Sequence, residues 1–185
     1  TLTINGEEID YHKNDAEIVL NDGEANLTKV EIPNDVDNVN VTYTREFKNT
    51  NSQPWYVPFD ITVPEGFTFY KIWTLEVDEN TGVATAVVSK ELSTGETIKA
   101  NTPYIVKADA AGTYDFNSDA LKATVEGEDN NKTWCATTEL MYHFYGSYTS
   151  FDLFSKPCYY MSAGAFSYAT KTATLKPYRF YLVVS

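Results

Sequence analysis

The sequence predicts an all-β fold, an antiparallel β-sandwich of jelly-roll type, with a partly closed β-barrel as the alternative. Three observations support this prediction. Residues that favour strands are frequent, including fourteen Tyr among 185 residues. Turn signals recur roughly every 8–12 residues. No helical stretch of about 10–15 residues separates the apolar segments, as it would in a parallel α/β sheet.

The N-terminal part predicts short strands joined by turns. Apolar residues lie at 2–4 and 18–20, and the pair Asn5-Gly6 between them suits a tight hairpin turn because both residues tolerate positive φ. A further short strand is expected at 28–32, where Pro33 ends it.

Residues 39–47 have the clearest periodicity in the chain. One face carries large apolar residues, namely Val39, Val41, Tyr43 and Phe47. The other face carries polar residues, namely Asn40, Thr42, Thr44 and Glu46. This alternation is typical of a half-buried strand.

The stretch from Trp55 to Ile61 is dense in aromatic side chains and carries no charge before Asp60. We expect a buried central strand here, with the other strands layered onto it. Pro58 has no backbone N–H, so this strand should contain a bulge or lie at a sheet edge.

The second half of the chain continues the pattern of strands and turns. Large residues follow one another along 67–77, and residues 78–82 should turn the chain into a hairpin strand at 83–88, with Gly82 left-handed. Further strands are expected at 97–100, 103–107, 112–116, 121–125, 134–135, 140–148, 158–161, 166–168 and 178–184. The last one should be tied into the sheet.

The length favours one domain, because about 100–200 residues form one core. We expect a single all-β domain over 1–185, with 1–33 as an N-terminal hairpin appendage or the end of a preceding module. The chain opens at Thr1 rather than Met, so we expect it to be cut from a longer precursor.

The charge restricts the partners. A net charge of −12 with scattered Lys and Arg argues against nucleic acid and against anionic membrane surfaces. No apolar run of about 18 residues is present, so we expect no membrane insertion of this segment. A cation or a neutral ligand remains compatible with this charge.

Few residues suggest catalysis. His12 and His143 are the only candidates for a Cys/His pair with Cys135 or Cys158, and His143 fits a partly buried strand residue. No Gly-x-Ser-x-Gly elbow occurs. The acidic residues fall mostly at turns, where exposure to solvent explains them. A glycan hydrolase is therefore the least favoured hypothesis. We therefore expect that the protein is not an enzyme and binds no cofactor.

Metal binding is weakly suggested at one turn. Asp78, Asn80 and Thr81 precede Gly82 as at the start of a calcium loop, but the bidentate Glu that should close such a loop is missing. A plain hairpin turn is the preferred interpretation, and we predict no metal site.

Aromatic residues offer one binding hypothesis, because flat rings stack on sugars. Trp55, Trp73 and Trp134 are candidates, although core packing explains most such rings. The late rings lie outside clear alternation and could form an exposed ligand-binding patch, namely Tyr145, Tyr148, Phe151 and Phe154.

The two cysteines, Cys135 and Cys158, allow two interpretations. They could form a disulfide across two strands in an oxidising compartment, or each could be a small buried hydrophobic residue. Spacing alone does not decide, because a bridge requires specific Cα geometry.

Four pieces in fixed order carry a resemblance, namely Leu20–Glu24, Tyr43–Asn51, Trp55–Phe59 and Ile98–Lys107. Together they resemble the β-rich C-terminal modules of secreted or surface proteins of Bacteroides-type anaerobes, often found behind leucine-rich or immunoglobulin-like repeats. The resemblance covers residues 20–185 and implies an extracellular or outer-surface, adhesion-type accessory module, but it brings no catalytic residues.

The expected function is thus a non-enzymatic cell-surface or secreted module of undefined ligand. The expected partner is a host or bacterial glycan or a surface protein. A carbohydrate-binding module that uses exposed aromatic rings is the alternative.

Overall fold

The structure, a computed structural model, describes residues 2–4, 7–11, 16–22, 30–124, 131–135, 141–153, 157–170 and 173–184. Its strands are β1 (Leu2–Ile4), β2 (Glu7–Ile9), β3 (Ala16–Asn21), β4 (Val30–Glu31), β5 (Val36–Phe47), β6 (Gln53–Trp55), β7 (Ile61–Thr62), β8 (Phe67–Val77), β9 (Ala84–Glu91), β10 (Thr97–Ile98), β11 (Tyr104–Ala108), β12 (Gly112–Leu121), β13 (Asn131–Cys135), β14 (Met141–Ser147), β15 (Phe151–Asp152), β16 (Cys158–Ser162), β17 (Ala165–Tyr168), β18 (Thr174–Leu175) and β19 (Arg179–Val184). No α-helix occurs in these ranges. The predicted all-β class is confirmed.

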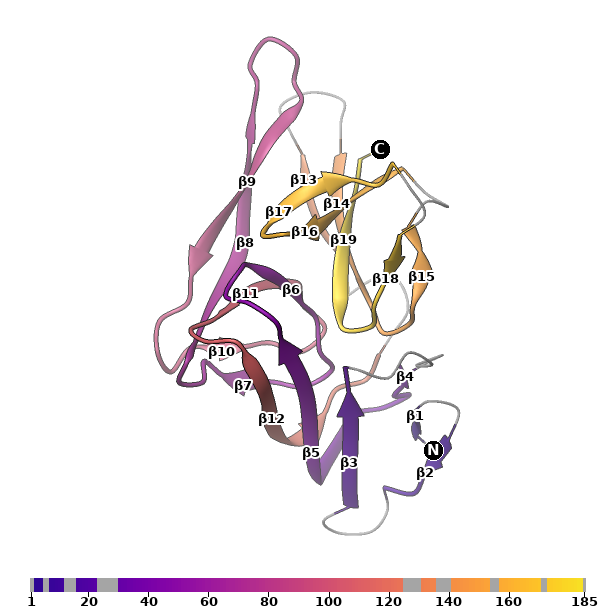
Figure 1. The fold of residues 1–185 in the computed structure, drawn as a ribbon. Helices are drawn as coiled ribbons and strands as arrows, with labels where there is room; N and C mark the ends of the chain where they lie inside the picture. Colours follow the sequence, from indigo (N-terminus) through magenta and orange to yellow (C-terminus); the bar gives the residue numbers. More distant parts are fainter. Residues whose placement is uncertain are drawn as a thin grey trace.

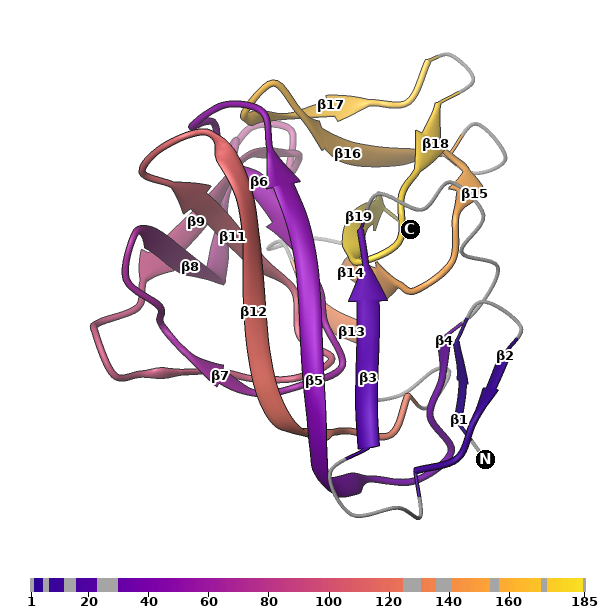
Figure 2. The same cartoon turned by 60° about the horizontal axis from the view of Figure 1, so that its bottom comes forward.

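Three larger sheets form a β-sandwich with layers in the strand orders β12-β5-β3, β6-β11-β8-β9 and β13-β14-β19-β16-β17 (Figure 1). Smaller sheets are β2-β1-β4, β10-β7 and β15-β18. No sheet in the described ranges closes into a barrel. The pairing is antiparallel as predicted, except that β3 runs parallel to β5 (Figure 2).

The sheet β6-β11-β8-β9 is the middle layer, and its strand β11 packs on both faces, whereas much of β9 is exposed. On β11, Val106 packs in the largest core cluster with Tyr43 of β5, while the next residue, Ile105, packs in a second cluster with Phe144 and Phe180 of the C-terminal sheet. Neighbouring strand residues point to opposite faces, so consecutive apolar residues indicate a strand covered on both sides.

The predicted alternation in β5 is confirmed. Val39, Val41, Tyr43 and Phe47 are at most 1% exposed, and the polar residues between them face outward or are half-buried. The same inward face also carries Arg45, which is fully buried. The apolar pattern did not predict this buried charge.

The N-terminal residues contribute to the main core. β1 pairs with β2 across residues 5–6, whereas the sequence places the second strand at 18–20, which lies in β3 and pairs with β5. Ile18 and Leu20 of β3 have no exposed surface and belong to the cluster that contains Tyr43. The described buried apolar residues of this N-terminal part thus pack into the same core as the rest of the chain.

The segment from Trp55 to Phe59 is buried as expected, but it is not the central strand that the sequence suggests. β6 is the edge strand of its sheet and ends at Trp55, and the next strand begins at Ile61. Pro58 cannot donate to a ladder, so the chain leaves the sheet before it reaches this residue.

Single long-range hydrogen bonds satisfy the backbone of this segment instead. The N–H of Tyr56 donates to the carbonyl of Tyr178 at 3.2 Å, Val57 accepts from Asn101 at 2.8 Å, and Pro58 accepts from Lys122 at 2.7 Å. Buried backbone polar groups need such partners, so the segment connects three parts of the chain.

Aromatic rings fill the largest core cluster around Trp55. Its indole contacts Tyr43, Phe69 and Phe116 in edge-to-face geometry, with ring centroids 4.9–5.5 Å apart. Such pairs add to the stabilisation from area burial. The indole therefore joins β5 and β12 to the middle sheet.

The last strand, β19, lies between β14 and β16 in the C-terminal sheet, which confirms that the end of the chain is tied in. Gly146 of β14 lies opposite Phe180 of β19. A Cβ atom built on Gly146 would overlap the ring of the fully buried Tyr56. The close approach of this ring to the strand thus requires glycine.

We predict that Gly146→Ala lowers the free energy of unfolding by about 3 kcal/mol or more, because the buried Tyr56 ring cannot move aside without disturbing the core. Urea unfolding followed by fluorescence measures the change. The control is Gly66→Ala, at a glycine with φ +84 and no atom near the added methyl group, where only backbone strain of roughly 1–2 kcal/mol is expected. Equal losses in the two variants would contradict the steric argument.

Candidate functional site

The structure places the predicted ring residues in different environments. Tyr148 is 8% exposed, packs against Tyr56 at 4.8 Å between ring centroids, and donates a hydrogen bond to Asn101 Oδ1 at 2.6 Å. Tyr145 is half-buried and stacks on Tyr181. Tyr148 is therefore a core residue rather than part of an exposed patch.

The other two residues of that hypothesis are not placed. The side chain of Phe151 and the whole of Phe154 lie outside the described residues. Exposure of Phe151 and Phe154 therefore stays a prediction. Tyr148 is buried and no longer belongs to the predicted patch.

Only one of the three tryptophans has a described, exposed ring. Trp55 is fully buried, and the side chain of Trp134 lies outside the described residues. Trp73 on β8 is 57% exposed, at a point where the register with β9 shifts between Ile72 and Thr74. Such a β-bulge re-aims the side chain of the extra residue.

The strand order argues against two pairings that the sequence suggests. β13 and β16 carry Cys135 and Cys158 and are separated by β14 and β19, which places their backbones about 14 Å apart at ordinary strand spacing. A disulfide requires a Cα distance of roughly 4.4–6.8 Å. His143 and Cys158 lie on either side of Val183 of β19, about 10 Å apart.

The turn at Asp78 has the geometry of a hairpin. Asp78 Oδ1 accepts hydrogen bonds from the backbone N–H groups of Asn80 at 2.8 Å and Thr81 at 3.2 Å. This carboxylate thus holds its own turn, as Asp does in Asx turns. In the described part of the chain, no group of three or more His, Cys, Asp or Glu side chains is close enough to hold a metal.

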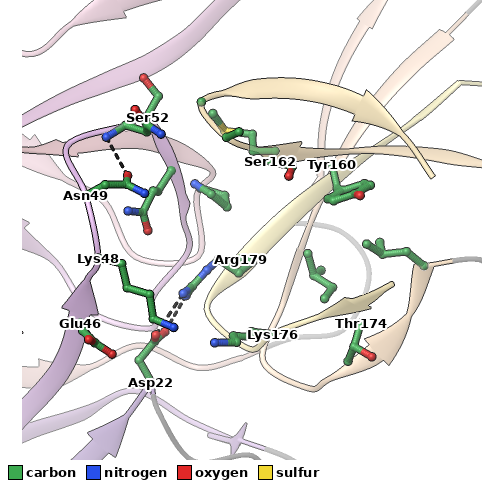
Figure 3. A pocket seen from close by; sticks show the side chains of 18 of the residues that line it. Asp22, Glu46, Lys48, Asn49, Ser52, Tyr160, Ser162, Thr174, Lys176 and Arg179 are labelled. Atoms are coloured by element: carbon green, nitrogen blue, oxygen red, sulfur yellow. Dashed lines mark hydrogen bonds and ion pairs between the residues drawn. The ribbon is translucent and has the colours of Figure 1, made fainter. Parts of the chain in front are cut away.

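A groove of about 570 Å³ is the best candidate site (Figure 3). One wall comes from the end of β3, from β5 and from residues 48–54. The opposite wall comes from residues 160–164 at the β16–β17 turn, from β18 and from the start of β19. The groove therefore lies along the seam between the N-terminal and C-terminal sheets, which the sequence pattern did not indicate.

The tip of the β16–β17 hairpin approaches the opposite wall. Ala163 and Gly164 have positive φ values of 51 and 81, as a two-residue hairpin turn requires. A Cβ atom at Gly164 would lie 3.5 Å from Cβ of Asn51. The position of the hairpin thus sets the width of the groove at this end.

A buried ion pair forms part of the groove wall. Arg179 donates to Asp22 with both terminal nitrogens, at 2.5 Å to Oδ1 and 3.0 Å to Oδ2, and only 6% of the Asp22 side chain is exposed. Tyr43 donates its hydroxyl to Asp22 Oδ1 at 2.8 Å. Bidentate geometry and a further donor satisfy a carboxylate that burial would otherwise destabilise.

These contacts shift the pKa values. Burial alone would raise the pKa of Asp22, but the hydrogen bonds and charge of Arg179 more than offset it, so the pKa lies below its usual value. Burial would likewise lower the pKa of Arg179, and Asp22 reverses the direction and raises it. Burial raises the pKa of Tyr43. Asp22 is thus a carboxylate at neutral pH.

Arg45 lies behind the groove wall, fully buried. It donates to the carbonyl oxygen of Pro54 at 2.9 Å and to Gln53 Oε1 at 3.0 Å, and its guanidinium lies 4.9 Å from the ring centroid of Phe47. Burial lowers its pKa to about 10, which still leaves it charged at neutral pH. It holds residues 53–54 against β5. In the sequence, the position of Arg45 on the inward face of an alternating strand was the only indication that it is buried.

Comparison of the chain with models of protein families, with curated proteins and with solved structures found no match. Among the described residues, no helical segment has the length and apolar character needed to cross a lipid bilayer.

We predict that Asp22→Asn destabilises the protein by about 3–5 kcal/mol at pH 7, because the substitution leaves the Arg179 charge buried without its partner. The effect should depend on pH. Since the folded-state pKa of Asp22 is lowered, its contribution is present above the unfolded-state pKa of about 4 and is lost as pH falls through the folded-state value.

Urea unfolding from pH 7 down to about pH 3 measures this dependence. The difference in free energy of unfolding between the wild type and Asp22→Asn should become smaller as the pH falls. The control Asp35→Asn breaks an exposed pair with Lys122 and should cost much less. A difference that stays constant down to the lowest pH would contradict the assignment.

Proposed function

We propose that this protein is an exported, non-enzymatic adhesion-type module that binds a carbohydrate chain in the groove between its sheets. The observation that carries the proposal is the composition of the groove rim. Neutral hydrogen-bonding side chains line both walls, namely Asn49, Asn51, Ser52, Ser162 and Thr174. Amides and hydroxyls of this kind match the hydroxyl groups of a sugar.

The groove also offers apolar surface. Met161, Ala163 and Leu175 lie among the polar groups, with the half-buried Tyr160 beside them. Sugar rings have C–H faces as well as hydroxyl edges, so a mixed lining suits them better than a purely polar one. The walls are strands and short turns of the sandwich, which keeps the binding groups in place before the ligand arrives.

The chemistry of the groove favours binding over hydrolysis. Glycoside hydrolysis uses two carboxyl groups, one of which must donate a proton. In the described part of the chain, two acids line the groove, Asp22 and Glu46. Asp22 is held by Arg179 and Tyr43 and has a lowered pKa, so it is a poor proton donor.

We predict that Ser162→Trp, which fills the groove from an exposed rim position, abolishes binding on a glycan array. Ser167→Trp is the matched control, because Ser167 is exposed on the same hairpin but does not line the groove. Equal binding by the two variants would exclude the groove as the site. Release of new reducing ends from a polysaccharide mixture by the wild-type protein would overturn the non-enzymatic assignment.

Trp73 supports a second candidate, a carbohydrate-binding surface on the β8–β9 hairpin. Its exposed indole has the ammonium groups of Lys71 and Lys90 at 5.5 and 5.3 Å from the ring centroid. Lys71 and Lys90 are direct cross-strand partners, an arrangement of like charges that weakens a sheet. A ligand that stacks on the ring or pairs with the lysines would offset this cost.

We predict that Trp73→Ala weakens glycan binding about tenfold if this surface is used, which is the size expected for one lost ring contact. Isothermal titration with a glycan found on the array measures the change. Val19→Ala, at an exposed apolar residue of β3, is the control. Unchanged affinity in Trp73→Ala would remove this surface and leave the groove as the only candidate.

A further inference from the structure

We propose that the groove selects carbohydrate chains that carry isolated carboxylate groups, as uronic acids and sialic acids do. This inference rests on the proposed function. It follows from the distribution of charge in the groove and not from its shape alone.

Among the residues that the structure describes, five charged side chains line the groove, namely Asp22, Glu46, Lys48, Lys176 and Arg179. Asp22 and Arg179 neutralise each other in the buried pair. The remaining one acid and two lysines sum to +1, in a chain whose net charge is −12. The groove is thus a locally positive site on an acidic protein.

The two lysines are available to a ligand. Both are exposed, and in the described part of the chain neither ammonium forms an ion pair with a carboxylate. Lys48 follows β5 on one wall, whereas Lys176 follows β18 on the other. Figure 3 shows Lys48, Lys176 and Arg179 extending from three segments toward the same part of the groove.

Arg179 is not the group that would bind the carboxylate of the ligand. Its terminal nitrogens donate to both oxygens of Asp22 and to the carbonyl oxygens of Pro177 and Tyr178. Recognition of a carboxylate therefore depends on Lys48 and Lys176, which act as point charges. The amides and hydroxyls of the rim remain for the sugar hydroxyls.

The same charges favour a sparsely charged ligand. A densely sulfated chain would bring many negative charges close to a protein that is itself strongly negative, and two lysines could neutralise few of them. A single carboxylate in the groove matches the net charge of +1 left by Lys48, Lys176 and Glu46 without this repulsion. A neutral chain could accept hydrogen bonds from the lysines but would gain no attraction between opposite charges.

The test uses matched ligands. A glycan array that includes uronic acid and sialic acid chains identifies binders, and each acidic binder is then compared with its methyl-esterified form, which has the same sugars without the charge. We expect the ester to bind at least about tenfold more weakly. Raising the salt from about 50 to 500 mM should weaken binding of the acid far more than of the ester.

Substitutions test whether the preference for the acidic ligand depends on the two groove lysines. Lys48→Gln/Lys176→Gln should reduce affinity for the acid about tenfold and leave affinity for the ester unchanged. Lys107→Gln, at an exposed lysine of β11 outside the groove, should change neither. All substituted residues are exposed, so the fold should be retained, and circular dichroism verifies this.

The possible failures are distinguishable. Binding that Ser162→Trp abolishes, but that is equal for acid and ester, would overturn this inference and leave the proposed function standing. Stronger binding of a heavily sulfated chain would likewise overturn it. An array with no bound glycan would overturn the proposed function and this inference together.

Discussion

The buried ion pair between Asp22 and Arg179 connects parts of the chain that are 157 residues apart in sequence. Asp22 directly follows β3, and Arg179 begins β19, so the pair joins the N-terminal and C-terminal sheets at their seam. Removing two charges from water is costly, and this pair is tolerated because its geometry is bidentate and Tyr43 adds a further donor. The position of the groove depends on this contact.

The segment Trp55–Phe59 holds the same layers together by different means. Its side chains are buried in an aromatic cluster, and its backbone bonds individually to Tyr178, Asn101 and Lys122. Tyr178 and Asn101 both have positive φ, a conformation that Asn tolerates but that is strained for Tyr. The surrounding core imposes these conformations, which indicates that the packing of this segment outweighs local preference.

The proposed recognition of a ligand and the stability of the fold thus depend on separate groups in the same small region. The buried carboxylate of Asp22 is bonded to Arg179 and Tyr43. The buried Arg45 donates with both terminal nitrogens to Pro54 and Gln53, while its Nε has no hydrogen-bond partner. Lys48 and Lys176 and the amides of the rim stay at the surface. Because the deep groups hold the two walls together, the backbone segments that carry the exposed groups are fixed before the proposed ligand binds.

The sequence by itself determined the β class, the alternation of β5 and the hairpin of β8 with β9, since these follow from local periodicity and turn residues. It also indicated that Trp55–Phe59 is buried, but not that Pro58 would keep most of it out of the sheets. Tertiary structure alone decided that Tyr148 belongs to the core, that Arg45 is buried, and that a groove lies along the seam. These features depend on contacts between segments far apart in sequence, and local patterns carry no information about such contacts.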